Sequence, residues 1–341
     1  MLLLIISILL IVLIGFSAHR ASLCSVSAVE EIITTRHAFM LLSFIKASVW
    51  ILGITLILTE VFSLYPLQAY GWQASVGTMI GGLIFGTGAA LNGGCAVSTL
   101  TRLGNGNLGK LLTLAGFFIG VLCFDFLQAE KLASAPLPAP TIFEITSNWK
   151  IWLAGSISLW MCWELGRLMR THLNRSFFRD LIAPRYKLSS AAFIIGASNG
   201  FLFFLYGIWL HTRLMGEMAR HLVFEAPSPD PLLGILFFAL LTGISISALH
   251  SRRFYLEWQP NVKWLLYFTG GIFMGIGSAV MPGGNDVIWL SALPSLSLHA
   301  VPAIFSILVG IAVTLFALRY VGLNIQHVDC RGDMCKVGDT P

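Results

Sequence analysis

The feature that most constrains this chain is a series of long apolar runs almost free of charge. A helix of about 20 residues crosses the roughly 30 Å hydrocarbon layer of a bilayer. Only helices and closed barrels satisfy their own backbone there, and continuous rather than alternating apolar runs indicate helices. The sequence therefore predicts an all-α integral membrane protein with nine spans, at about 2–18, 38–62, 74–91, 110–127, 150–167, 188–206, 231–249, 263–281 and 300–319.

Composition excludes most other classes of protein. Only 11% of the 341 residues are charged and 56% are hydrophobic, whereas soluble domains have about 25% charged residues. The net charge of +5 comes from basic residues in short connections between apolar runs, which is typical of orientation signals. We therefore expect the protein surface to contact the lipid bilayer and not a nucleic acid. The first run lacks the basic start of a signal peptide, and we expect it to be retained as a span.

The distribution of Lys and Arg predicts the orientation. With the N-terminus outside, sixteen of the 21 basic residues fall in cytoplasmic connections, four fall in outer connections and Lys46 falls within a span. Cytoplasmic connections of membrane proteins are enriched in Lys and Arg. We therefore expect a multi-pass protein of the bacterial inner membrane, with its N-terminus outside and its C-terminus in the cytoplasm.

Four connections are too apolar and too rich in small residues to be simple solvated loops. They cover 19–36, 92–107, 207–224 and 282–298. We predict that each is a short re-entrant helix or turn that dips toward the middle of the membrane. Non-helical backbone is tolerated at that depth only where protein buries it or where it lines an aqueous path.

An internal repeat accompanies these elements. The segment 78–100 parallels the segment 267–290, because both contain Gly-Gly, then Gly-x-Gly, then a second Gly-Gly and a further apolar run. An odd number of spans separates the two copies, so the second is expected upside down relative to the first. Inverted repeats are a signature of transporters with a site near the midplane. The predicted divisions are 1–127, the first repeat; 128–187, a linker span with a basic loop; 188–320, the second repeat; and 321–341, a cytoplasmic tail.

The sharpest motif is the Gly-Gly-Cys sequence of Gly93, Gly94 and Cys95. Glycines allow backbone to approach a ligand closely, and a following helix start offers free amides and partial positive charge to an anion. In the first short element, Cys24 also lies among small hydroxyl residues. The matching position of the second copy has Gly283, Gly284 and Asn285, an amide in place of a thiol. The simpler interpretation of the glycines is close helix packing.

Other polar residues are accessory candidates. Lys46 is either a counter-charge for an anion or a side chain that reaches the cytoplasmic surface, and Asp286 either binds a short-helix terminus or titrates in coupling. Cys330 and Cys335 in the tail form either a sulfur-handling thiol pair or part of an unstructured segment, and a zinc site has only weak support there. Cys123 and Cys162 lie in plain apolar runs, where we expect small buried hydrophobes, as is usual for free cysteine. No metal and no cofactor is predicted.

Three segments, HRASLCSVSAV, LNGGCAVSTLTRLGNGNLGK and PGGNDVIWLSALPSLSLHAVPA, together resemble the YeeE/YedE family of sulfur-transport permeases. The resemblance covers nearly the whole chain. It implies an hourglass-shaped protein whose short helices meet at the centre and which takes up thiosulfate past a series of cysteines without a large rocking motion. Cys24 and Cys95 match two of those cysteines. The third is replaced by Asn285.

The leading hypothesis is therefore a permease, not an enzyme, for a small sulfur-containing anion, most simply thiosulfate. We expect Cys24 and Cys95 to remain protonated during passage, since a thiolate would repel the anion. The alternatives are a transporter of selenium or another sulfur species, a membrane thiol redox protein, and a structural subunit for a cytoplasmic sulfurtransferase. A cytoplasmic sulfur-carrier or sulfurtransferase is the predicted protein partner. The chain has no Gly-Lys-Ser/Thr nucleotide loop, so ATP coupling would need another chain.

Overall fold

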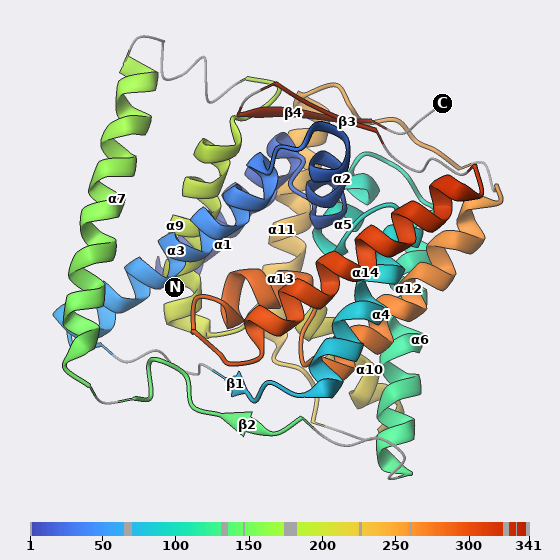
Figure 1. Ribbon diagram of the computed structural model, residues 1–341, viewed down its shortest axis with the longest axis horizontal. Coiled ribbons are helices and arrows are strands. Elements are labelled where there is room, and N and C mark those ends of the chain that lie inside the picture. The colour runs from blue at the N-terminus through green and yellow to red at the C-terminus, as the bar shows by residue number, and fades with distance from the viewer. Residues whose placement is uncertain are drawn as a thin grey trace.

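The computed structural model describes residues 2–64, 70–130, 136–145, 147–173, 183–224, 227–258, 261–322, 327–331 and 333–338. A long helix lies on each of the nine predicted apolar runs (Figure 1). These helices are α1 (Leu2–Ala21), α3 (Phe39–Leu56, extended by the wider turn η1, Ile57–Val61), α4 (Val76–Asn92), α6 (Lys110–Ala129), α7 (Trp149–Leu173), α9 (Leu188–Tyr206), α11 (Pro231–His250), α12 (Lys263–Val280) and α14 (Ala300–Tyr320).

Seven of the helical segments in the described chain are long and apolar enough to cross a membrane, and an eighth is added when the bent pair that begins with α12 counts as one span. Length and apolarity therefore support eight of the nine predicted spans in the described chain, counting the bent pair as one. The helix that falls short is α7, because tryptophans and charged residues interrupt its apolar run. Large apolar side chains such as Trp152, Phe238 and Phe305 are exposed on the outside of the bundle, where lipid would cover them.

All four connections that were predicted to contain short elements are helical. They form α2 (Ser25–Thr35), α5 (Ala96–Gly104), α10 (His211–Phe224) and α13 (Asn285–Val287), which continues as the wider turn η2 (Ile288–Ala292). The break between α12 and α13 bends the pair by 47°. Each short helix starts after an interruption that follows a long helix, so its first amides lie within the bundle rather than at its end.

The helices of the two halves interleave. α1 packs against α11 in the way that α9 packs against α3, and α4 packs against α14 in the way that α12 packs against α6. The short helices follow the same correspondence: α2 contacts α14 as α10 contacts α6, and α5 contacts α11 as η2 contacts α3. Two contacts, α1 with α9 and α4 with α12, join equivalent helices of the two halves.

The crossing of α4 and α12 brings backbone against backbone. A Cβ added at Gly88 would lie 2.5 Å from the carbonyl oxygen of Gly270, and one added at Gly270 would lie 2.7 Å from the carbonyl oxygen of Gly88. Gly81 and Gly277 stand in the same reciprocal relation, with added Cβ atoms 3.0 Å and 2.6 Å from the opposite carbonyl oxygens. The glycines of the sequence repeat therefore serve close helix packing at these four positions.

Short strands lie at the two ends of the bundle (Figure 1). At one end β1 (Gly71–Trp72) pairs antiparallel with β2 (Pro138–Ala139). At the other end β3 (His327–Arg331) and β4 (Met334–Gly338) form an antiparallel hairpin against α2. The described part of the tail is thus ordered. The β1–β2 end is the predicted outer face, and the β3–β4 end is the predicted cytoplasmic face. Connections that the Lys and Arg count places on the same side of the membrane thus lie at the same end of the bundle.

A pH dependence of stability is expected from His299, which is buried just before α14. Its amide donates to the carbonyl of Trp72 (3.2 Å), and its Nδ1 lies 2.8 Å from Ser297 Oγ. Burial lowers the pKa of His299 to about 4 from the usual 6.5, so between these values the unfolded chain binds a proton that the folded chain does not. Stability is therefore fully present above pH 6.5 and falls by up to about 3 kcal/mol as the pH approaches 4. The melting temperature of His299→Gln should therefore fall less than that of wild type as the pH is lowered from 6.5 to 4. An identical decline in the variant would contradict the assignment.

Candidate functional site

The two cysteines singled out by the sequence meet in the interior. Cys24 directly precedes α2 and Cys95 directly precedes α5, both in extended backbone. The amide of Cys95 donates to Cys24 Sγ (3.3 Å), and the Cys24 thiol donates to Ser98 Oγ (3.4 Å). Both cysteines are almost fully buried, at 2% and 1% exposed. Two helix N-termini, each with a thiol at its first position, therefore face one another, and such termini have free amides and partial positive charge.

The second half of the chain contributes to the same place. Asn285 begins α13 and accepts a hydrogen bond from Ser25 Oγ at its Oδ1 (3.0 Å). Ser25 is the first residue of α2, next to Cys24. Asn285 is 1% exposed. Asn285, which stands where the family resemblance implies a third cysteine, is thus hydrogen-bonded to the residue next to Cys24.

The glycines of both motifs are required by conformation or by space. Gly93 and Gly283 have φ of 68° and 133°, which side chains other than glycine rarely adopt. At Gly94 an added Cβ would lie 2.1 Å from Ser98 Oγ, and at Gly284 one would lie 2.6 Å from Thr212 Cγ2. Glycine at these positions lets the chain turn from a long helix into a short one within the core.

A buried lysine supports the Gly-Gly-Cys turn. Lys110 Nζ donates to the backbone carbonyl of Asn92 (2.6 Å) and to its side-chain Oδ1 (3.0 Å), and lies 3.3 Å from the ring centroid of Tyr267. Asn92 in turn donates to the carbonyl of Gly94 and to Thr99 Oγ1, both at 2.7 Å. Lys110 therefore places a positive charge at the C-terminal end of α4, where the helix dipole favours a cation. It also fixes the turn that presents Cys95.

Replacing Lys110 with methionine should loosen this turn. The change keeps the length of the side chain but leaves the buried carbonyl of Asn92 without its donor, which costs about 1–3 kcal/mol. We expect a lower melting temperature of the purified protein. Lys263→Met is the matched control, because Lys263 also begins a long helix and is exposed. Equal melting temperatures for the two variants would show that Lys110 has no such role.

A cavity of about 370 Å³ opens at the end of the bundle where β1 lies and reaches the Gly-Gly turn before α13. Its exposed part is lined by two ion pairs, Arg213 with Glu217 (2.6 Å) and Arg220 with Asp125 (3.4 Å). Buried Thr212 and Gly284 and half-buried Gly283 also line it. The cavity therefore includes the residue before Asn285, at the start of α13.

Other candidates lie elsewhere. Lys46 forms an ion pair with Glu164 of α7 (3.0 Å) and donates to Ser189 Oγ (3.0 Å), so it joins long helices and is not part of the short-helix centre. Asp286, in contrast, lies at the centre, where its Oδ1 accepts a hydrogen bond from Thr212 (2.8 Å).

The expectation for Cys123 and Cys162 was wrong: both are exposed on the outside of the bundle. Small apolar side chains are accepted there because lipid covers that surface.

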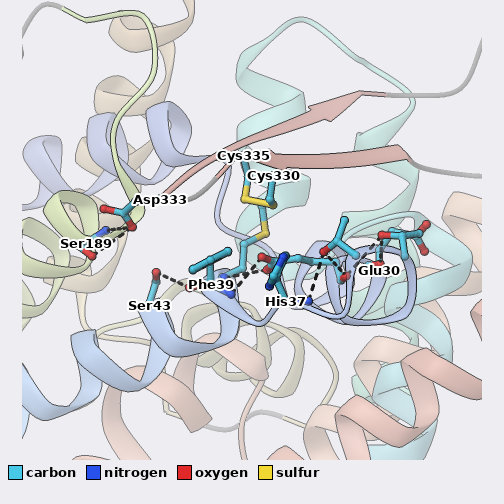
Figure 2. The surroundings of a disulfide bond; sticks show 12 residues. Glu30, His37, Phe39, Ser43, Ser189, Cys330, Asp333 and Cys335 are labelled. Carbon is cyan, nitrogen blue, oxygen red and sulfur yellow. Dashed lines mark hydrogen bonds between the residues drawn. A yellow bond between two sulfur atoms is a disulfide. The ribbon is translucent and has the colours of Figure 1, made fainter.

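The tail cysteines form a disulfide between Cys330 and Cys335 in the β3–β4 hairpin (Figure 2). Between the two strands, Asp333 accepts hydrogen bonds from the amide and hydroxyl of Ser189 (both 3.1 Å) at the start of α9. The hairpin therefore connects α2 with α9. A carboxylate oxygen of Glu31 lies within 4.8 Å of both sulfur atoms, but disulfide sulfurs are not the thiolates that bind zinc. The same carboxylate accepts hydrogen bonds from the amides of Phe39 and Met40, which start α3.

Several site residues were not selected as candidates from the sequence. Ser25, Ser98 and Lys110 contact the motif residues, yet serine is common in membrane helices and a lysine at the start of a span usually lies at the surface. His211 and Thr212 were not selected either, although they lie in the predicted short element 207–224. The available signal was two polar residues four and five positions after Gly207, directly after the apolar residues 208–210.

The arrangement defines a class: a polytopic α-helical membrane protein in which short helices place thiols and amides at its centre. The sequence matches the Sulphur transport family over residues 20–313, and the chain belongs to that family. It is 25% identical over 324 residues to the thiosulfate transporter TsuA of Spirochaeta thermophila, an alignment that covers 87% of this chain and 93% of the relative. It is 31% identical to the thiosulfate transporter TsuA of Escherichia coli over 108 residues, about 31% of this chain and 30% of that protein.

Proposed function

We propose that this protein is a permease that carries thiosulfate, or a closely related sulfur anion, across the bacterial inner membrane. The observation that supports it most is the convergence of Cys24, Cys95 and Asn285 at the starts of short helices, next to a Gly-Gly turn that lines a cavity. An anion that leaves water for the membrane centre loses hydration worth tens of kcal/mol in the bare Born limit. Helix amides, thiols and the Asn285 amide are the donors that would offset this loss.

The proposed architecture is two inverted repeats, 1–127 and 188–320, each with two re-entrant short helices, joined by a linker span and followed by the tail. The pairwise correspondence of helix contacts between the halves supports it. In this scheme all nine long helices span the membrane, and α7 does so at the edge of the bundle. The proposed site consists of residues from both repeats, namely Cys24, Gly93, Gly94, Cys95, Gly283, Gly284 and Asn285.

The proposed chemistry is passage by donor exchange. The anion would enter through the outer cavity, meet the amides at the start of α13, and pass to the thiols of Cys95 and Cys24. Neutral thiols are polarizable, weak donors suited to a terminal sulfur atom. The third thiol is absent from the Gly-Gly-Asn turn, so we propose that the Asn285 amide binds an oxygen of the anion instead.

The test is uptake of ³⁵S-thiosulfate by cells that lack their own thiosulfate importers. Cells that express the protein should accumulate label in a saturable way, and excess unlabelled thiosulfate should compete. Competition with sulfate, sulfite and selenite would distinguish thiosulfate from the other sulfur and selenium species. A protein that reaches the membrane in normal amounts, yet takes up no more label than cells with an empty vector, would overturn the proposal.

The proposed orientation has the β1–β2 end outside and the tail in the cytoplasm. Single-cysteine variants test it in a background without other cysteines, because Gln73 and His37 are exposed at opposite ends. Gln73→Cys should react with a membrane-impermeant maleimide in intact cells, whereas His37→Cys should react only after permeabilisation. The reverse labelling pattern would invert the topology.

A second candidate function, thiol–disulfide exchange, is favoured by the Cys330–Cys335 disulfide. A disulfide in the cytoplasm meets reducing conditions, so on the proposed face it would be open to reduction. The proposed partner is a cytoplasmic sulfur-carrier or sulfurtransferase protein whose two thiols become a disulfide as Cys330 and Cys335 are reduced. Because Cys335→Ser leaves Cys330 as a free thiol, this variant should attack the oxidised, disulfide form of the partner, which is the reverse of that step. The mixed disulfide on Cys330 should then accumulate, because Cys335 is not there to resolve it. A protein that traps no partner and keeps full uptake would exclude this role.

A further inference from the structure

A buried pair of ionisable residues lies beside the proposed anion path. His211 begins α10 and Asp286 is the second residue of α13. His211 Nδ1 lies 3.1 Å from Asp286 Oδ2, and the two side chains are 2% and 0% exposed. Neither ring nitrogen of His211, nor Asp286 Oδ2, has an aligned hydrogen bond among the described residues. Ionisable side chains inside a membrane are expensive to bury and usually mark an ion pathway or proton relay.

The pair adjoins residues that line the cavity at the β1–β2 end of the bundle. Thr212, which lines it, donates to Asp286 Oδ1 (2.8 Å). Gly284 also lines it, and a Cβ there would lie 2.7 Å from Asp286 Oδ1. A second cavity of about 10 Å³ adjoins His211 and Thr212, which is about the smallest space that holds one water molecule. The pair is therefore shielded from bulk solvent but one residue away from Asn285 and from the cavity.

Other charged groups on the elements packed against the pair engage one another or lie at helix ends. On α10 these are Arg213 with Glu217, and Arg220 with Asp125 of α6. On α6, Lys110 binds the carbonyl of Asn92. α5 and α11 have Arg102 and His250 in their last turns, and Cys24 and Cys95 are the nearest titratable groups of the first half.

The charge of the pair decides what it does to an anion. As neutral imidazole with carboxylate, the pair has a net charge of −1, which repels an anion in the cavity. After it binds one proton the pair is neutral, whether as imidazolium with carboxylate or as imidazole with carboxylic acid. Proton binding and anion binding at neighbouring sites must then favour each other to the same extent.

Coupling to a proton would also lower the free energy needed to move the anion inward against the membrane potential. A membrane potential that is negative inside opposes the inward movement of each negative charge, so it opposes a thiosulfate dianion twice as strongly as a monoanion. We propose that His211 and Asp286 bind a proton from the outer cavity and that this proton travels inward with the anion. One proton per dianion halves the charge moved. This inference rests on the proposed function.

The experiment uses the purified full-length protein in liposomes, with ³⁵S-thiosulfate outside and a pH-sensitive dye inside. With equal pH on both sides, thiosulfate should enter down its gradient and acidify the interior. An interior more alkaline by one pH unit should raise the initial rate several-fold. Asp286→Asn and His211→Gln should retain downhill thiosulfate entry but lose the acidification and the stimulation. His37→Gln, at an exposed histidine far along the chain from the pair, should behave like wild type.

Each outcome bears on a different claim. Thiosulfate entry by wild type without acidification would overturn proton coupling and leave the permease intact. If an alkaline interior stimulates uptake by both variants as much as by wild type, the proton does not bind at this pair and the assignment is overturned. No thiosulfate entry by wild type would overturn the permease, and the coupling with it. The wild-type dye signal does not depend on either variant folding.

Discussion

Replacing Cys95 with alanine is expected to reduce thiosulfate uptake about 10- to 100-fold. The reason is the position of this thiol, which stands at the first residue before α5, 1% exposed, with its own amide bound to Cys24 Sγ. A hydrogen bond to a charged group in the interior contributes about 1.5–3 kcal/mol, which corresponds to that range of rates. Cys24→Ala should lower uptake to a similar extent, because Cys24 lies between Cys95 and Ser98.

Serine distinguishes two roles of the thiol. If the thiol acts as a donor, Cys95→Ser should recover uptake to within about tenfold of wild type, since a hydroxyl donates at least as well. If a covalent bond to sulfur is needed, serine should be as inactive as alanine. Cys123→Ala and Cys162→Ala are matched controls, because both are free cysteines exposed on the outside of the helix bundle. Both variants should take up thiosulfate normally. Uptake that survives both Cys24→Ala and Cys95→Ala, at normal membrane levels, would exclude a path through the thiols.

The second large effect concerns folding rather than transport. Gly88→Val and Gly270→Val should each remove most of the folded protein, because an added Cβ would stand 2.5 Å and 2.7 Å from an opposing carbonyl oxygen. Neither backbone can withdraw without separating α4 from α12, so the cost should exceed the usual 1–3 kcal/mol of overpacking. The measurement is the monodisperse fraction of detergent-extracted protein by size-exclusion chromatography, where we expect at least a fivefold loss.

Gly155→Val is the control for the substitution itself. Gly155 lies within α7, and nothing lies within 4 Å of a Cβ built there. Its valine variant should be extracted like wild type, apart from a small change in helix propensity. Monodisperse Gly88→Val protein in normal yield would show that α4 and α12 are not in backbone contact.

The long helices could be predicted because membrane spans depend on length and apolarity, which a single sequence contains. The exception was α7, whose tryptophans and charges leave it below the threshold of an apolar span although it is helical. The two Gly-Gly turns could be predicted because glycine pairs recur at matching places in the two repeat copies, before Cys95 and before Asn285. The hydrogen bond between Ser25 and Asn285, 260 residues apart, was not predicted, since the sequence showed only that both lie in short elements.

What the sequence could not provide were partners chosen by three-dimensional packing. Lys46 was indistinguishable from a surface lysine until its ion pair with Glu164 was seen. Lys110 looked like an ordinary residue at the start of a span, yet it is fully buried on Asn92. The pairing of His211 with Asp286 depends on how α10 meets α13, and no local pattern reports that meeting. The tail disulfide depends on the hairpin register that places Cys330 opposite Cys335.

The interleaving of the helices has a consequence for biosynthesis. α1 packs against α9 and α11, and α3 packs against α9, but α9 begins roughly 170 residues after α1 ends. At 5–20 residues per second, the ribosome takes on the order of ten seconds or more to make that stretch. The first helices must therefore wait in the translocon or the lipid without their final neighbours. The hairpin that joins α2 to α9 is made later still, roughly 140 residues after the start of α9. Neither half is then a folding unit by itself, and the nascent chain depends on insertion machinery until its second half arrives.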